Sequence, residues 1–191
     1  MSMCLIECIK VSKSFKENHV IKELSISIKN NKTYLLLGEN GSGKSTFMKL
    51  LIDLYKPTKG IIKRHFKDLR YVPEQMHIKS DIIVVDYIKN VLSLKKLKRN
   101  LELELDLELE LRKPLKHLSK GNQKKVLLYL ALVGSPDILC LDEPLDGLDT
   151  LMQEKVLDLL KNLSITLIIS THSQEKYQHF NPKEVIFFEV D

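Results

Sequence analysis

A glycine-rich segment, Gly38-Glu-Asn-Gly-Ser-Gly-Lys-Ser45, matches the GxxxxGK[ST] pattern of a phosphate-binding loop. The apolar run 33–37 before it predicts a buried strand, and the apolar spacing of residues 44–55 predicts a helix after it. In such a loop backbone N–H groups and the helix N-terminus surround a phosphate. We expect Lys44 to reach the β- and γ-phosphates and Ser45 to bind Mg²⁺. The predicted nucleotide-binding residues here are Gly38, Asn40, Gly41, Ser42, Gly43, Lys44, Ser45 and Thr46.

Two adjacent carboxylates, Asp142 and Glu143, follow the apolar run 138–141, which predicts another buried strand. In proteins that also have a phosphate-binding loop, such an aspartate organises Mg²⁺ and its waters. A second carboxylate just beyond can accept a proton from an attacking water. A strand that ends in Asp-Glu is weak evidence for such a site by itself. The phosphate-binding loop upstream makes that evidence strong.

The segment Leu118-Ser-Lys-Gly-Asn122 resembles the LSGGQ signature of the ATP-binding cassette (ABC) ATPases. Ser119 and Gly121 match, whereas Lys120 replaces the first glycine and Asn122 the glutamine. Taken alone, Ser119 could simply cap the helix that follows.

Other segments resemble the remaining ABC motifs, in the family's order. Gln75 resembles the Q-loop glutamine, residues 145–149 resemble the D-loop, and His172 resembles the switch histidine. Phe15 stands where the family has an aromatic that stacks on adenine. Singly, Gln75 and His172 could be surface residues and Phe15 a core residue, but together the motifs cover residues 5 to about 190.

The resemblance implies ATP hydrolysis with Mg²⁺. Glu143 would polarise the attacking water, His172 would hold the γ-phosphate and that water, and Gln75 would touch Mg²⁺ or water. Ser119 and Gly121 would contact ATP held by a second cassette, and Asp149 of the D-loop would join the nucleotide site. The family thus implies a homo- or heterodimer with two sandwiched ATP molecules.

The fold implied is an α/β P-loop NTPase of ABC type: a mostly parallel sheet flanked by helices, a small antiparallel β region and a short helical subdomain. Residues 1–191 would form one domain, with the helical subdomain at about 76–125. We expect further strands at 5–11, 25–28, in pieces of 61–72, at 167–169 and at 185–188, and helices at 124–134 and 151–163. The Leu/acid alternation of 101–111 suggests a strand, yet leucine and glutamate favour helix; we expect helix first and a turn near 106–114.

Composition fits a globular chain, with 43% hydrophobic and 29% charged residues and a net charge of +5. No apolar run is long enough for a membrane span, and no signal peptide is evident, so we expect a cytoplasmic protein peripheral to the membrane. Three cysteines argue against a disulfide framework, and Cys140 reads as core.

The family resemblance further implies a separate transmembrane permease subunit. It would dock beside the Q-loop, at residues 74–95. Apolar candidates there, which could equally be core, are Met76, Ile78, Ile82, Tyr87 and Ile88. The signature with Lys120 in place of the first glycine resembles that of export-type cassettes.

Two other functions stay open: a non-transport ABC ATPase on nucleic acid or ribosomes, and a regulatory ATP-binding scaffold. We expect no nucleic-acid partner, because five acids interrupt the basic stretch 95–125. Lys44, Asp142, Glu143 and His172 argue against a scaffold.

Overall fold

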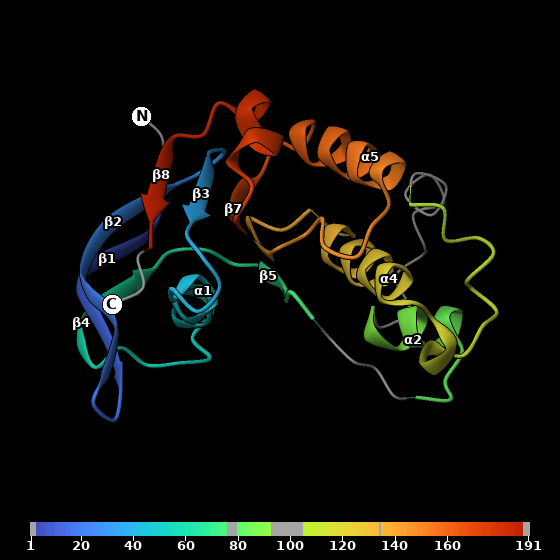
Figure 1. The fold of residues 1–191 in the computed structure, drawn as a ribbon, viewed down its shortest axis with the longest axis horizontal. Coiled ribbons are helices and arrows are strands. Elements are labelled where there is room, and N and C mark those ends of the chain that lie inside the picture. The colour runs from blue at the N-terminus through green and yellow to red at the C-terminus, as the bar shows by residue number, and fades with distance from the viewer. Residues whose placement is uncertain (1–2, 76–79, 93–104, 134, 189–191) are drawn as a thin grey trace. The chain divides into compact units, whose positions relative to one another are not determined.

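The computed structural model describes residues 3–75, 80–92, 105–133 and 135–188. It divides into two compact units (Figure 1). The first comprises Met1–Tyr71, Pro136–Glu143 and Ser164–Asp191, and the second comprises Val72–Ser135 and Pro144–Leu163. The second unit extends beyond the helical subdomain that the sequence suggested at 76–125.

The first unit holds two sheets. In the antiparallel sheet, β1 (Cys4–Phe15) lies between β2 (Asn18–Lys29) and β4 (Lys59–Arg64). The other sheet has the order β5-β6-β7-β3-β8, from β5 (Leu69–Val72), β6 (Ile138–Asp142), β7 (Thr166–Thr171), β3 (Thr33–Leu37) and β8 (Glu184–Phe187). Strand β3 is parallel to β7 and β8, and β6 is parallel to β7. The mostly parallel sheet and the small antiparallel region are therefore confirmed.

Helix α1 (Lys44–Leu51) follows β3 after the glycine-rich loop 38–43 and buries Phe47, Met48, Leu50 and Leu51 against the core of this unit. It ends earlier than the expected residue 55, because Asp53 adopts a left-handed φ of 64° that a helix cannot continue. Cys140 is fully buried in β6, as predicted, and burial raises the pKa of its thiol. All three cysteines are free.

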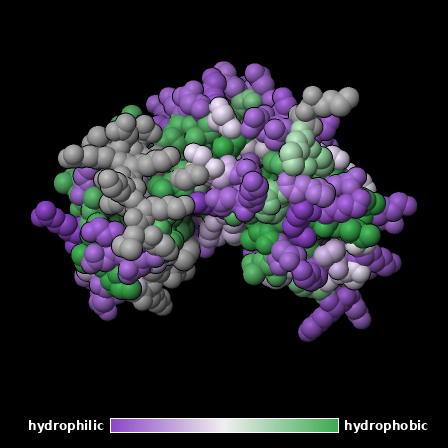
Figure 2. All heavy atoms as spheres, turned by 180° about the vertical axis from the view of Figure 1, so that it is seen from behind, coloured by the Kyte–Doolittle hydropathy of each residue, from purple (hydrophilic) through white to green (hydrophobic). Residues whose placement is uncertain are grey.

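The second unit contains the helices α2 (Val84–Val91), α4 (Lys120–Leu132) and α5 (Thr150–Lys161). Short 3₁₀ segments lie at Leu115–His117 in this unit and at Gln174–Phe180 in the first. Helix α4 begins four residues before the expected start, because the Ser119 hydroxyl accepts the Asn122 N–H at 3.2 Å and caps it. Figure 2 shows a largely polar surface near α5, in keeping with the exposed Glu154, Asp158 and Lys161.

The Leu/acid segment is described from residue 105 onward. Its residues 105–112 form successive turns, with Leu105 and Leu107 buried, Asp106 at a left-handed φ of 49° and Leu109 84% exposed. The predicted turn near 106–114 is therefore confirmed. The helix expected before it falls at residues outside those described.

Candidate nucleotide-binding site

Three neighbouring strands carry the predicted phosphate-binding and carboxylate residues to one edge of the parallel sheet. Leu37 of β3 pairs with Thr171 of β7, and Asp142 of β6 pairs with Ser170. The chain then leaves β3 into the glycine-rich loop, β6 into Glu143 and β7 into His172. Open α/β sheets bind their ligands at this carboxyl edge. The first unit therefore brings together the ends of three strands that lie far apart in the sequence.

The glycine-rich loop needs glycine at both of its ends. A Cβ at Gly38 would lie 2.2 Å from the Phe188 carbonyl oxygen, and a Cβ at Gly43 would lie 2.9 Å from Val20 Cγ1. Gly43 precedes α1 with a left-handed φ of 107°, and no side chain caps that helix. The first N–H groups of α1 are thus left for another acceptor, which suits a phosphate.

Lys44 is almost wholly buried beneath this loop. Its Nζ donates to the carbonyl oxygens of Gly38 at 2.7 Å and Glu39 at 3.0 Å. The Ser42 hydroxyl is also buried and has no hydrogen-bond partner among the described residues. A cation held against the loop, beside uncapped amides, gives the segment the chemistry of an anion site.

Asp142 is buried at the end of β6 and accepts two hydroxyl hydrogen bonds. Tyr71 Oη donates to Oδ2 at 3.1 Å, and Ser170 Oγ donates to Oδ1. No cluster of three or more His, Cys, Asp or Glu side chains that could hold a metal occurs in the described part of the chain. One carboxylate and a hydroxyl such as that of Ser45 fit Mg²⁺, which protein carboxylates and substrate phosphates bind together.

Glu143 is buried and has a left-handed φ of 44°. Its N–H lies 3.2 Å from both the carbonyl oxygen and the hydroxyl of Ser170, and its Oε1 lies 3.2 Å from His172 Nδ1. Burial raises the pKa of this carboxyl, while His172 and Lys44 oppose that rise. A buried carboxyl with a raised pKa and an adjacent exposed histidine suits a general base.

The second unit holds the other predicted residues. Ser119 is the exposed N-cap of α4, and Asp149 is the N-cap of α5, its Oδ1 accepting the Met152 N–H at 2.9 Å. Gly121 packs against the D-loop, because a Cβ there would lie 2.4 Å from the Gly147 carbonyl oxygen. Gln75 is exposed, with its Nε2 3.4 Å from Glu74 Oε1. Their contacts with nucleotide stay predictions.

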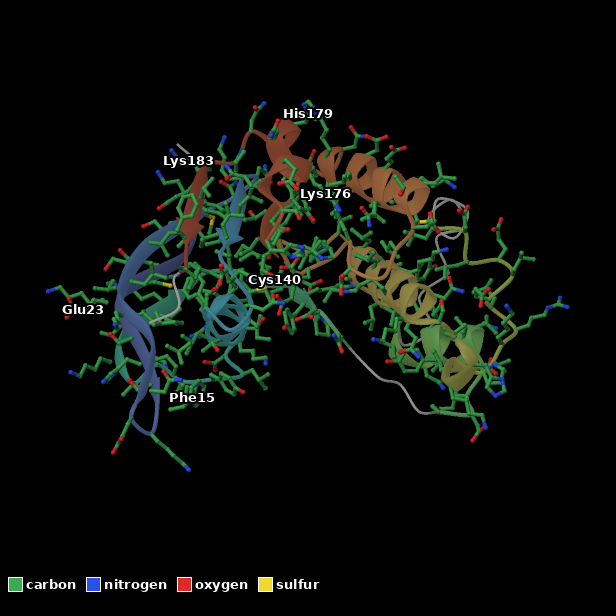
Figure 3. All side chains as sticks on the ribbon, viewed as in Figure 1. Phe15, Glu23, Cys140, Lys176, His179 and Lys183 are labelled. Atoms are coloured by element: carbon green, nitrogen blue, oxygen red, sulfur yellow. The ribbon has the colours of Figure 1, made fainter. Side chains whose placement is uncertain are left out.

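Phe15 ends β1 in the first unit, near the tip of the β1–β2 hairpin (Figure 3). It is 42% exposed, its ring meets Tyr55 edge-on at 5.5 Å, and Lys13 Nζ lies 4.8 Å from its centroid. The ring is thus not a core residue, although its place against adenine stays a prediction.

Sequence reasoning missed three residues that touch the site elements. Tyr71 and Ser170 hold Asp142, and the buried Lys124 donates from Nζ to the carbonyl oxygens of Pro73 at 3.1 Å and Glu74 at 2.8 Å. Tyr71 belongs to the same segment as Gln75, and Ser170 stands next to Thr171-His172. No spacing pattern marks either hydroxyl, because their contacts depend on which strands lie side by side.

The ABC transporter family model matches residues 21–146. An ABC transporter ATP-binding protein of Methanocaldococcus jannaschii, MJ1023, is 31% identical and covers 92% of this chain and 71% of its own length. The zinc import ATP-binding protein ZnuC of Rickettsia prowazekii is 35% identical, covering 90% of this chain and 78% of that protein. The spermidine/putrescine import ATP-binding protein PotA of Acetivibrio thermocellus is 32% identical, covering 87% of this chain and 53% of that protein.

Solved structures confirm the fold. A structure described as the ATP-binding subunit of an ABC transporter superposes with a TM-score of 0.85 at 22% identity, covering 97% of this chain and 88% of the other. The cassette MJ0796, a dimer bound to ADP and Pi, superposes with a TM-score of 0.83 at 22% identity, covering 98% of this chain and 97% of the other.

Proposed function

This chain belongs to the ABC transporter family as an ATP-binding subunit with ATPase activity, and from that premise we propose that paired cassettes use ATP to drive a separate membrane subunit. The observation that carries the proposal is the shared carboxyl edge of β3, β6 and β7. It gathers the glycine-rich loop, Asp142, Glu143 and His172. Binding charge, metal-ligand chemistry and a base are therefore available in one unit.

Each residue has a distinct task in the proposed reaction. Lys44 and the N–H groups of α1 bind the phosphates, for which Lys44 exchanges its carbonyl contacts for phosphate oxygens. Asp142 and Ser45 would hold Mg²⁺, which supplies charge neutralisation for phosphoryl transfer. Glu143 takes a proton from the attacking water, and His172 holds that water and the γ-phosphate in place. Gln75 would contact the metal or water.

The second unit supplies what a partner cassette needs. Ser119 is exposed at the start of α4, where the N-terminus of the helix and a hydroxyl can meet a phosphate. We place Ser119 and Gly121 on the partner's ATP, with Asp149 joining the nucleotide site. Two ATP molecules thus lie between two cassettes, and hydrolysis releases the pair.

A membrane subunit would dock on the second unit. Ile82, two residues before α2, is 46% exposed, and Val91, the last residue of α2, is 51% exposed. Ile88 is fully buried and is therefore core. Tyr87 is half-buried, and Met76 and Ile78 lie outside the described residues. None of the described helices is both long and apolar enough to cross a bilayer.

The direction of transport has two opposing indications. Export rests on Lys120 in the signature, and it stays a prediction. The names of ZnuC and PotA specify import, which favours the opposite direction. Transport measured in inside-out and right-side-out vesicles carrying the full complex distinguishes the two.

Lys44→Ala tests the nucleotide site directly. Losing the buried cation should weaken ATP binding at least about tenfold, since a charged hydrogen-bond donor is lost. Titration with a fluorescent ATP analogue measures this. Lys49→Ala, at the far end of the same helix, is the matched control and should bind normally. If Lys44→Ala and Lys49→Ala bound the ATP analogue with equal affinity, the glycine-rich loop would not be part of the nucleotide-binding site.

A further inference from the structure

Asp142 lies on the strand between two neighbours, and each neighbour contributes one hydroxyl to it. The sheet order places β6 between β5 and β7. Tyr71 of β5 donates to Oδ2 at 3.1 Å, and Ser170 of β7 donates to Oδ1. Each carboxylate oxygen thus has its own donor, and the two donors come from opposite sides of the strand.

Ser170 also touches the next residue. The Ser170 Oγ donates to Asp142 and also accepts from the Glu143 backbone N–H at 3.2 Å. The Ser170 carbonyl oxygen accepts from the same N–H at 3.2 Å. Glu143 has a left-handed φ of 44°, a conformation that costs a non-glycine residue free energy and persists only where its surroundings hold it. One buried serine therefore contacts both residues of the carboxylate pair.

We propose that Tyr71 and Ser170 are positioning residues that orient the Asp142 carboxylate for the Mg²⁺ of Mg²⁺–ATP, and that Ser170 also sets the backbone of Glu143. The proposal rests on the proposed function. Rotation of an aspartate carboxylate about its terminal bond is soft, so an unheld group occupies many orientations. Two donors on separate oxygens fix its plane. A carboxylate oxygen has two lone pairs, so accepting one hydroxyl hydrogen bond is compatible with binding a metal.

A purely structural role makes a different prediction. Any buried carboxylate needs donors, and losing one destabilises the fold whether or not a metal binds. Hydroxyls at the opposite edge of the same sheet provide the comparison. Tyr34 Oη accepts the Lys29 N–H at 2.8 Å, and Thr166 Oγ1 accepts the Asn31 N–H at 3.0 Å. Tyr34→Phe and Thr166→Val are therefore matched controls for Tyr71→Phe and Ser170→Ala.

The experiment titrates Mn²⁺, as a spectroscopic substitute for Mg²⁺, into the full chain with a non-hydrolysable ATP analogue, and follows free Mn²⁺ by electron paramagnetic resonance. Affinity for the same analogue in EDTA is measured alongside. We expect Tyr71→Phe and Ser170→Ala to weaken Mn²⁺ binding roughly three- to tenfold, the range of a hydrogen bond to a charged group. Metal-free analogue affinity should stay within about twofold, and both controls should bind Mn²⁺ like the wild type.

Wild-type Mn²⁺ affinity in both Tyr71→Phe and Ser170→Ala would overturn the proposal, as would equal weakening in the controls. If Ser170→Ala does not fold, Tyr71→Phe, which changes only a half-buried side chain, decides alone. A wild-type chain that binds neither the analogue nor Mn²⁺ with it would instead overturn the proposed function, and this inference with it.

Discussion

At the scale of single residues, Glu143 combines three properties in one side chain: burial, an exposed histidine neighbour and a raised pKa. A general base works only when ionised, so lowering the pH through its pKa must stop it. Because burial shifts that pKa upward, activity should be lost at a higher pH than for an ordinary glutamate.

We therefore expect the acid limb of kcat to have its midpoint at a higher pH than the pKa of an ordinary glutamate would give. The measurement is a pH profile of ATPase activity at saturating Mg²⁺–ATP. Residual activity of Glu143→Gln should lack this limb, because its amide does not titrate. A wild-type midpoint at the ordinary value, or the same limb in both proteins, would separate the base from Glu143.

Phe15 gives a second prediction at this scale. If its exposed ring stacks on adenine, Phe15→Ala should weaken ATP binding about tenfold, within the range of a base stacked on an aromatic side chain. GTP should lose affinity similarly, because stacking reads no base edge. The edge-on partner Tyr55 supplies the control Tyr55→Ala, measured in the same fluorescence titration. If Phe15→Ala bound ATP with wild-type affinity, adenine would bind elsewhere than on the Phe15 ring.

At the scale of elements, local sequence patterns predicted those structural features that depend only on residues close together in the chain. The run 33–37, the loop and α1 follow from apolar spacing and glycine positions, and they appear nearly as expected. Helix α4 begins earlier than its apolar spacing predicts, because the Ser119 hydroxyl accepts the Asn122 N–H and caps the helix there. The partners of Asp142 could not be predicted, since Tyr71 meets it only once β5 and β6 lie side by side.

The contacts of Lys124 could not be predicted from the sequence either, because they join segments that are distant in the chain. They give a prediction for the second unit. The buried Nζ of Lys124 joins α4 to the backbone at Pro73 and Glu74, just before Gln75. Lys124→Met should cost about 1–2 kcal/mol of unfolding free energy, because two carbonyl oxygens lose a charged donor while the desolvation of a charge is relieved. Urea unfolding measures the loss, and amide exchange at Glu74 and Gln75 should quicken. Lys125→Met, one position along, should change neither.

At the scale of the whole molecule, each unit has part of what the reaction needs. The first unit holds the loop, the carboxylates and His172, and the second holds Ser119, Gly121 and Asp149. In the function we propose, a pair of cassettes joined through ATP would supply both sets at each nucleotide. Ser119 is the position to test, because any side chain at Gly121 would also strike Gly147 in its own subunit.

The central claim is that ATP joins two cassettes, and light scattering after size exclusion tests it most directly. Glu143→Gln, which keeps the site's shape and stalls hydrolysis, should move from 22.1 kDa to about twice that mass with ATP and Mg²⁺. Adding Ser119→Asp keeps a good helix cap but opposes a carboxylate to the partner's phosphate, so this variant should bind ATP and stay monomeric. Ser119→Asn, a neutral cap of similar size, should still pair. Full wild-type ATPase activity in a sample that remains at monomer mass throughout turnover would contradict the account.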